Sequence, residues 1–226
     1  MASDSRLSLN TTQQQGDRQV IQMAVGFSDS NYKTFLAPNN VGISTFGAAD
    51  IQGVPIAGYI ESFISEHLSD GEVEVDGVPP KLLGYFRQFS PLPPVGFIVA
   101  GYKYQDEQKQ QQVWLVDTQS NEFKQVNPPG QQGAQWGGEA DILARLINPV
   151  AELDPSGKIK QVLPHFPIPW QFFTLQDAID FCVFAVRSTI DAIRFQPRPK
   201  SVGGPIDVLV IKPDEAFWVQ RKELHV

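Results

Sequence analysis

The sequence predicts an α+β protein, specifically a four-layer αββα sandwich in which two antiparallel sheets stack and helices cover the outside. Its periodic segments come in the order strands, two helices, strands, two helices, strands. Strict strand–helix alternation, which a doubly wound parallel sheet requires, is absent. With 226 residues, 42% of them hydrophobic, the chain can bury a sizeable core, and we expect a single domain over residues 1–226.

The first part of the chain alternates short apolar runs with turn-forming residues. Alternating leucines before residue 10 and the apolar run 20–25 predict two strands around a polar hairpin loop at 10–19. Residues 34–36 and 41–47 predict two more strands, because Pro38 and the two asparagines after it favour a turn.

Two helices are expected next. Apolar side chains at helical spacing predict a helix over 56–68, and Pro55 suits its start. After a loop rich in Asp and Gly, a second helix is expected to run from Pro79 to Phe89, before Pro91 stops it.

The middle of the chain returns to extended structure. Residues 95–104 are apolar and β-prone, and 113–116 and 122–126 predict two further strands. The stretch 105–112 is expected to be a turn, and the short glutamine runs at 13–15, 108–112 and 131–132 are interpreted as solvated loops. Residues 127–138 contain two prolines and four glycines and predict a loop.

The last third begins with a helix over 139–147 and a Pro-rich stretch, 150–173, that shows no clear period. A long helix follows, because Thr174 and Asp177 have the spacing of a capping box. It ends before Pro197, and strands over 206–211 and 217–220 predict a closing hairpin.

Composition excludes several function classes. The net charge is −7, which argues against a nucleic-acid or anionic-membrane surface. No run of ~18 apolar residues predicts a transmembrane helix, and no signal peptide is visible, so we expect a cytoplasmic protein. The lone Cys182 lies in an apolar run and is interpreted as a small buried hydrophobe. The three histidines are scattered, so neither a metal nor any other cofactor is expected.

Four segments carry a resemblance to a known family. They are Ala-Ser-Asp-Ser-Arg-Leu-Ser at 2–8, Lys-Thr-Phe at 33–35 with the strand after it, the two strands around 105–112, and Gly-Gly-Pro-Ile-Asp-Val-Leu-Val-Ile at 203–211. In order and spacing this resembles the proteasome β-subunit branch of the N-terminal-nucleophile hydrolases. The resemblance covers nearly the whole chain and implies the αββα fold.

In that family an N-terminal threonine, serine or cysteine attacks the scissile carbonyl, and its own α-amine, with a pKa near ~8, accepts the proton. A buried lysine keeps the amine neutral, and an aspartate orients the lysine. By position in the motifs, the resemblance assigns these site roles to Lys33 and Asp4, with Arg6 as a nearby structural charge. The substrate it implies is a peptide.

This sequence departs from the family pattern in three places. The strand that carries the nucleophile should precede Ala2, where only Met1 stands. The loop at 135–138 lacks the family's serine, and 199–202 lacks its acid and has the serine displaced by one. Either the chain begins at an internal methionine or the protein is a pseudo-enzyme. We expect the chain as printed not to hydrolyse peptides.

The alternatives are therefore a proteasome-like peptide or amide hydrolase and a catalytically inactive subunit with an assembly role. A small-ligand module that uses the same cleft is a third, and Trp136 is either a packing or a pocket residue. The family assembles into rings, and the helices over 56–68 and 82–89 are rich in apolar side chains. We therefore expect a homo-oligomer, a dimer or a ring, through these helices.

Overall fold

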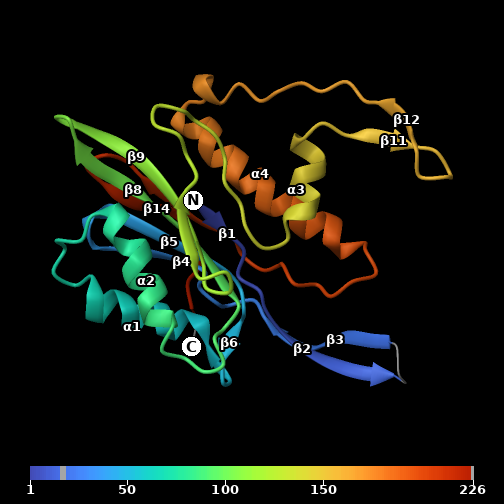
Figure 1. Cartoon of the computed structure of the whole chain (residues 1–226), viewed down its shortest axis with the longest axis horizontal. Coiled ribbons are helices and arrows are strands. Elements are labelled where there is room, and N and C mark those ends of the chain that lie inside the picture. The colour runs from blue at the N-terminus through green and yellow to red at the C-terminus, as the bar shows by residue number, and fades with distance from the viewer. Residues whose placement is uncertain (16–18, 225–226) are drawn as a thin grey trace.

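The structure is a computed structural model that describes residues 1–15 and 19–224, without the side chains of 9–25. Over these residues it is an α+β protein with several antiparallel sheets and four α-helices (Figure 1). A three-stranded sheet has the order β1-β13-β14, and a five-stranded sheet has the order β10-β9-β8-β5-β4. Their strands are β1 (Ala2–Ser3), β4 (Thr34–Ala37), β5 (Val41–Gly47), β8 (Val95–Gln105), β9 (Gln108–Asp117), β10 (Glu122–Gln125), β13 (Asp207–Ile211) and β14 (Ala216–Gln220).

The main core lies between the five-stranded sheet and the first two helices. Helix α1 (Ile56–His67) contacts β4, and α2 (Val78–Phe86) contacts β9 and β10. Alternate residues of the strands face these helices, as the pleat requires. The largest fully buried side chains of this core are Ile43, Ile60, Phe63, Leu82, Phe86 and Phe97.

The other two helices lie beside the three-stranded sheet. Helix α4 (Leu175–Arg194) contacts β1 and β13, and α3 (Ala140–Ile147) contacts α4. The capping box expected at the start of α4 is confirmed: Thr174 Oγ1 accepts from the amide of Asp177, whose carboxylate accepts from the Thr174 amide.

The two large sheets meet where β5 faces β13. Gly42 of β5 has no side chain there, and a Cβ added to it would lie 2.6 Å from Ile211 Cδ1. Its neighbours Val41 and Ile43 point to the opposite face and join the core under α1 and α2. Gly42 therefore lets the two sheets approach closely.

A buried ion pair fixes β13 to the segment after β14. Asp207, which is fully buried, accepts from the backbone amide of Lys222 at 2.7 Å and pairs with its ammonium. The Lys222 ammonium also lies 4.4 Å from the centre of the Tyr32 ring. Asp207 of the Gly-Gly motif thus anchors the chain beyond the sheet.

The described part of the chain also forms three two-stranded hairpins. They are β2–β3 (Leu7–Gln15 and Gln19–Ser28), β6–β7 (Asp50–Ile51 and Val54–Pro55) and β11–β12 (Ala151–Leu153 and Ile159–Val162), and short 3₁₀ turns lie at Pro38–Asn40, Val75–Gly77 and Trp170–Phe172. Figure 1 shows β2–β3 and β11–β12 extending away from the sheets.

Two predicted turns are wrong. The expected loop at 10–19 is strand as far as Gln15 and again from Gln19, and its centre, 16–18, lies outside the described residues. The expected turn at 105–112 is also mostly strand, because β9 begins at Gln108 and pairs with β8 along its whole length. Both stretches are polar, so they lack the apolar alternation that marks a half-buried strand.

The apolar side chains of α1 and α2 do not form the exposed face that we expected. Most of them belong to the core described above, so the reason given for self-association through these helices is wrong. Large exposed apolar side chains gather instead in the later part of the chain: Leu146, Leu153, Ile159, Val162, Leu163, Phe166, Phe172, Leu175, Phe184 and Phe195. None of the described helices is both long and apolar enough to cross a membrane.

Candidate functional site

Asp4 and Lys33, predicted as site residues, form an ion pair. The Lys33 Nζ lies 2.8 Å from Asp4 Oδ1. Asp4 directly follows β1 and Lys33 directly precedes β4, so the pair joins the two large sheets. The Asp4 side chain is only 8% exposed and that of Lys33 is 21% exposed, so the lysine keeps access to solvent while its partner is buried.

Backbone amides hold the second oxygen of Asp4. Its Oδ2 accepts from the amides of Arg6 and Gly203, each at 3.0 Å. The adjacent Ser5 reinforces this contact, because its amide donates to the Gly203 carbonyl at 3.0 Å and its hydroxyl to the Pro205 carbonyl at 2.6 Å. These two backbone amides therefore fix the carboxylate, which in turn fixes the direction of the Lys33 ammonium.

Arg6 pairs with Asp29 and not with the site carboxylate. Its Nε and Nη2 donate to the two Asp29 oxygens, each at 2.7 Å, and the guanidinium lies 4.2 Å from the centre of the Phe27 ring. Hydrogen bonding to Arg6 lowers the pKa of Asp29, and the same bond raises the pKa of Arg6. Arg6 thus holds β2–β3 beside the site, a structural position.

A small cavity of about 120 Å³ lies beside Lys33. Arg6, Thr45 and Ser201 contribute polar groups to its wall, and Phe46 contributes an aromatic ring. Thr45 is 6% exposed, and its hydroxyl has no hydrogen-bond partner among the residues that the structure describes. The cavity is large enough to hold water molecules or one small side chain of a ligand.

Ser201 is the serine that stands one position away from the place of the family's serine, and the sequence did not predict a site role for it. It lines the cavity and donates to the Glu139 carboxylate, just before α3. Arg198 also bonds Glu139, at 3.2 Å, and reaches Asp141 at 3.0 Å. The acid beside this serine therefore comes from another segment, and no local motif signals it.

The hydroxyls of Ser3, Thr34 and Ser44 form a hydrogen-bonded group near the site that the sequence did not predict. Thr34 Oγ1 lies 2.8 Å from Ser3 Oγ and 2.7 Å from Ser44 Oγ. Ser3 belongs to β1, and the other two residues are paired across β4 and β5. These bonds join the two sheets one residue away from both Asp4 and Lys33.

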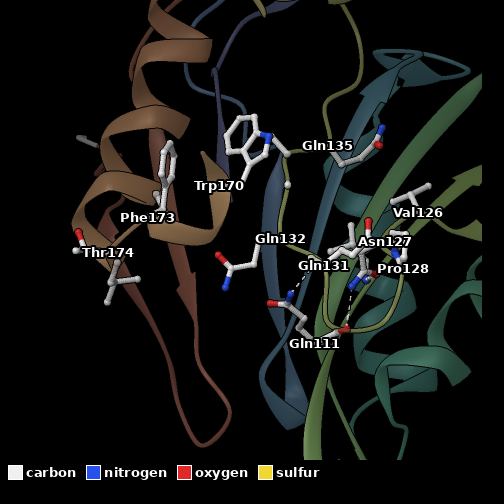
Figure 2. Close-up of a pocket in the computed structure, with 15 residues that line it drawn as sticks. Gln111, Val126, Asn127, Pro128, Gln131, Gln132, Gln135, Trp170, Phe173 and Thr174 are labelled. Atoms are coloured by element: carbon white, nitrogen blue, oxygen red, sulfur yellow. Dashed lines mark hydrogen bonds between the residues drawn. The ribbon is translucent and has the colours of Figure 1, made fainter. Parts of the chain in front are cut away.

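A larger groove of about 370 Å³ lies between the β9–β10 side of the molecule and the start of α4 (Figure 2). Gln111, Gln131 and Gln132 contribute to its lining. Gln131 and Gln132 are exposed and lie in a loop, as predicted, whereas Gln111 lies in β9 and not in a loop. Trp136 is half-buried and is not among the residues that line either cavity. Cys182 is also only half-buried, which corrects its interpretation as a fully buried side chain.

Within residues 1–15 and 19–224, no group of three or more His, Cys, Asp and Glu side chains is placed to hold a metal. Comparison of the chain with models of known protein families gives no match, and neither does comparison with curated proteins. Function is therefore inferred from the geometry around Lys33 and from the motifs that form it.

Proposed function

We propose that this chain is a proteasome-like member of the N-terminal-nucleophile hydrolase superfamily. The observation that carries the proposal is the Asp4–Lys33 ion pair beside a small cavity. Two residues assigned to one site from separate motifs lie in hydrogen-bond contact, 29 positions apart in the sequence. Contacts of α1 and α2 with one sheet and of α4 with the other support the four-layer αββα sandwich as part of the same proposal.

In the proposed reaction, the Lys33 ammonium acts on an N-terminal threonine, serine or cysteine, whereas the printed sequence begins with Met1. Its positive charge keeps a neighbouring α-amine neutral and stabilises the oxyanion form of the hydroxyl. The neutral amine then takes the hydroxyl proton as the oxygen attacks an amide carbonyl. Asp4 keeps the ammonium in place, and a small side chain of the peptide substrate would occupy the cavity at Thr45.

A catalytically inactive subunit of the same fold is the second candidate, and the loop before α3 favours it. The family places a serine there, whereas this loop has Gly137, and a Cβ at Gly137 would collide with the ring of Phe46. Ser201, the nearest hydroxyl in the following motif, already donates to Glu139. In this alternative the Asp4–Lys33 pair only joins the sheets.

The resemblance also implies partners and a location. We propose that copies of the chain associate into a dimer or ring, and that exposed apolar residues between 146 and 195 contribute to the contact. A cytoplasmic location, which the single cysteine favours, belongs to the same proposal.

The test begins with the intact mass of the native protein, which fixes its N-terminal residue. Native protein and a Lys33→Ala variant are then assayed with a panel of fluorogenic peptides. Lys103→Ala is a matched control, because Lys103 also pairs with an aspartate, Asp76, at 2.5 Å, but does not line the cavity. Turnover that disappears only in Lys33→Ala supports the hydrolase. Absence of turnover in native protein with a confirmed N-terminus supports the inactive subunit.

A further inference from the structure

The larger groove is separate from the cavity at Lys33 and shares no lining residue with it. One wall is formed by Trp170, Phe173 and the first residues of α4, and the other by Gln111 and Val113 of β9 and the loop after β10 (Figure 2). Its volume of about 370 Å³ lies within the range of ligand sites, about 300–1,000 Å³. None of the described residues that line it is charged.

The aromatic wall is held in place by packing behind it. The ring centres of Trp170 and Phe173 lie 5.2 Å apart, and the Phe181 ring meets Trp170 edge-on at 4.9 Å. Both wall residues are only half-buried, so part of each ring faces the groove. The groove therefore offers a preformed flat apolar surface to a ligand.

The opposite wall is built from side-chain amides, and some of them are already committed. Asn127 donates to the Gln111 carbonyl at 2.9 Å, and Gln111 donates to the Gln131 carbonyl at 3.2 Å, which fixes the start of the loop. The next side chain, Gln132, has no hydrogen-bond partner in the described part of the chain, and Figure 2 shows it extending across the groove toward Phe173 and Thr174. Its amide is free to bind a ligand.

The backbone of the loop adds a row of further donors and acceptors. Residues 131–137 belong to no helix or strand. Among the described residues, no backbone amide between Gln131, which donates to Pro128, and Ala140, which donates to Gly138, has a backbone partner. Gly133 and Ala134 within this stretch line the groove and are exposed. A second polypeptide lying along the loop would meet successive backbone amides that have no backbone partner among the described residues.

We propose that this groove binds an extended, uncharged segment of polypeptide rich in proline and glutamine. A charged segment would lose hydration and find no opposite charge on the lining. Proline rings suit the flat surface of Trp170, as in other aromatic grooves that bind polyproline segments, and the ligand's carbonyls and amides suit Gln132 and the loop backbone. The proposal goes beyond hydrolysis and does not depend on Lys33.

The test measures fluorescence anisotropy of a labelled, amidated peptide of about ten residues that alternates proline and glutamine, which spans about 30 Å in polyproline II form. Saturable binding is expected, and Trp170→Ala should weaken it about tenfold or more. Ala134→Glu, which puts a charge in the groove at an exposed position without removing packing, should weaken it by a similar factor. Phe172→Ala is the matched control, because the Phe172 ring is 77% exposed, lies in the same 3₁₀ turn as Trp170 and does not line the groove. The affinity of this variant for the peptide should stay within about twofold of the wild-type value.

Several results would overturn the proposal. They are absence of saturable binding, equal affinity for a peptide in which glutamate or lysine replaces glutamine, and displacement of the peptide by the neutral oligosaccharide maltoheptaose. Lys33→Met separates this proposal from the hydrolase, because it should leave binding in the groove unchanged whether or not the protein cleaves peptides. Loss of binding in that variant would place the peptide at the other cavity.

Discussion

Asp4 should contribute more to stability through the hydrogen bonds that it accepts from two backbone amides than through its ion pair with Lys33. In Asp4→Ala, the amides of Arg6 and Gly203 lose their acceptor, and the Gly203 amide is buried. A buried donor without a partner costs about 1–3 kcal/mol. The buried Gly203 amide contributes this full cost, and the part-buried Arg6 amide contributes less. Together with the lost ion pair, the free energy of unfolding should fall by about 4 kcal/mol. That is a large share of the total for a typical domain, which is about 5–15 kcal/mol.

Asp4→Asn separates the two contributions. The asparagine side-chain oxygen still accepts from both amides, while its NH₂ group faces the Lys33 ammonium, which can turn toward solvent because its side chain is 21% exposed. We expect a loss of only about 1–2 kcal/mol from the broken pair. Lys33→Met, which leaves both amide bonds in place, should cost a similar amount.

The assay is urea unfolding of the wild type and the three variants, with the slopes compared to confirm two-state behaviour. For a chain of this length, the expected loss in Asp4→Ala corresponds to a fall in Tm of about 8–16 °C. Asp76→Ala is the control, because it removes the carboxylate of a more exposed pair and should cost less than about 1 kcal/mol. If Asp4→Ala and Asp4→Asn are equally stable, the amides do not depend on this carboxylate and the reasoning fails.

Three further predictions follow from other parts of the structure. Arg6 lowers the pKa of Asp29, so the contribution of Asp29 to stability is present above its unfolded pKa of about 3.9 and is lost as pH falls through its folded pKa. In urea titrations, the stability difference between wild type and Asp29→Asn should be about 1 kcal/mol at pH 7 and should shrink below about pH 4. A difference that does not change with pH would contradict this. Thr45→Val removes a buried hydroxyl that has no partner among the described residues, so denaturation should show no loss, whereas a loss above about 1 kcal/mol would reveal a partner. Replacing the exposed Phe166 and Phe172 by serine should lower the mass found by light scattering if copies associate through this surface, and an unchanged mass would place the contact elsewhere.

Helices were the most predictable part of the fold because their signals are local. Apolar spacing and Pro55 place α1 within one residue of its observed end, and the Thr174–Asp177 capping box marks the start of α4. The strand ends at 10–15 and 108–112 could not be found in the same way. Their backbone pairs in a hairpin, but the side chains of 108–112 are mostly exposed, so the sequence there carries no alternation.

The site was predictable only where each of its residues belongs to a motif that assigns it a role. Asp4 and Lys33 were identified from two motifs, and the structure places them in contact. The Gly203 amide and the Glu139 partner of Ser201 were not identified, because each contact joins segments far apart in the sequence, 199 and 62 residues respectively. Such contacts are created by the packing of the sheets and leave no spacing pattern to read.

The bond between Asp4 and Gly203 also sets an order of events during synthesis. A ribosome that adds about 5–20 residues per second needs about 10–40 s to travel between these two positions. For most of this interval Asp4 and Lys33 have already been synthesised, but β1 has no strand to pair with, because β13 is its only strand partner among the described residues. The nascent chain therefore carries both members of the ion pair without the amide that orients them. The last residue in the chain that lines the cavity at Lys33 is Ser201, so this cavity cannot be complete until the chain has been made beyond that position.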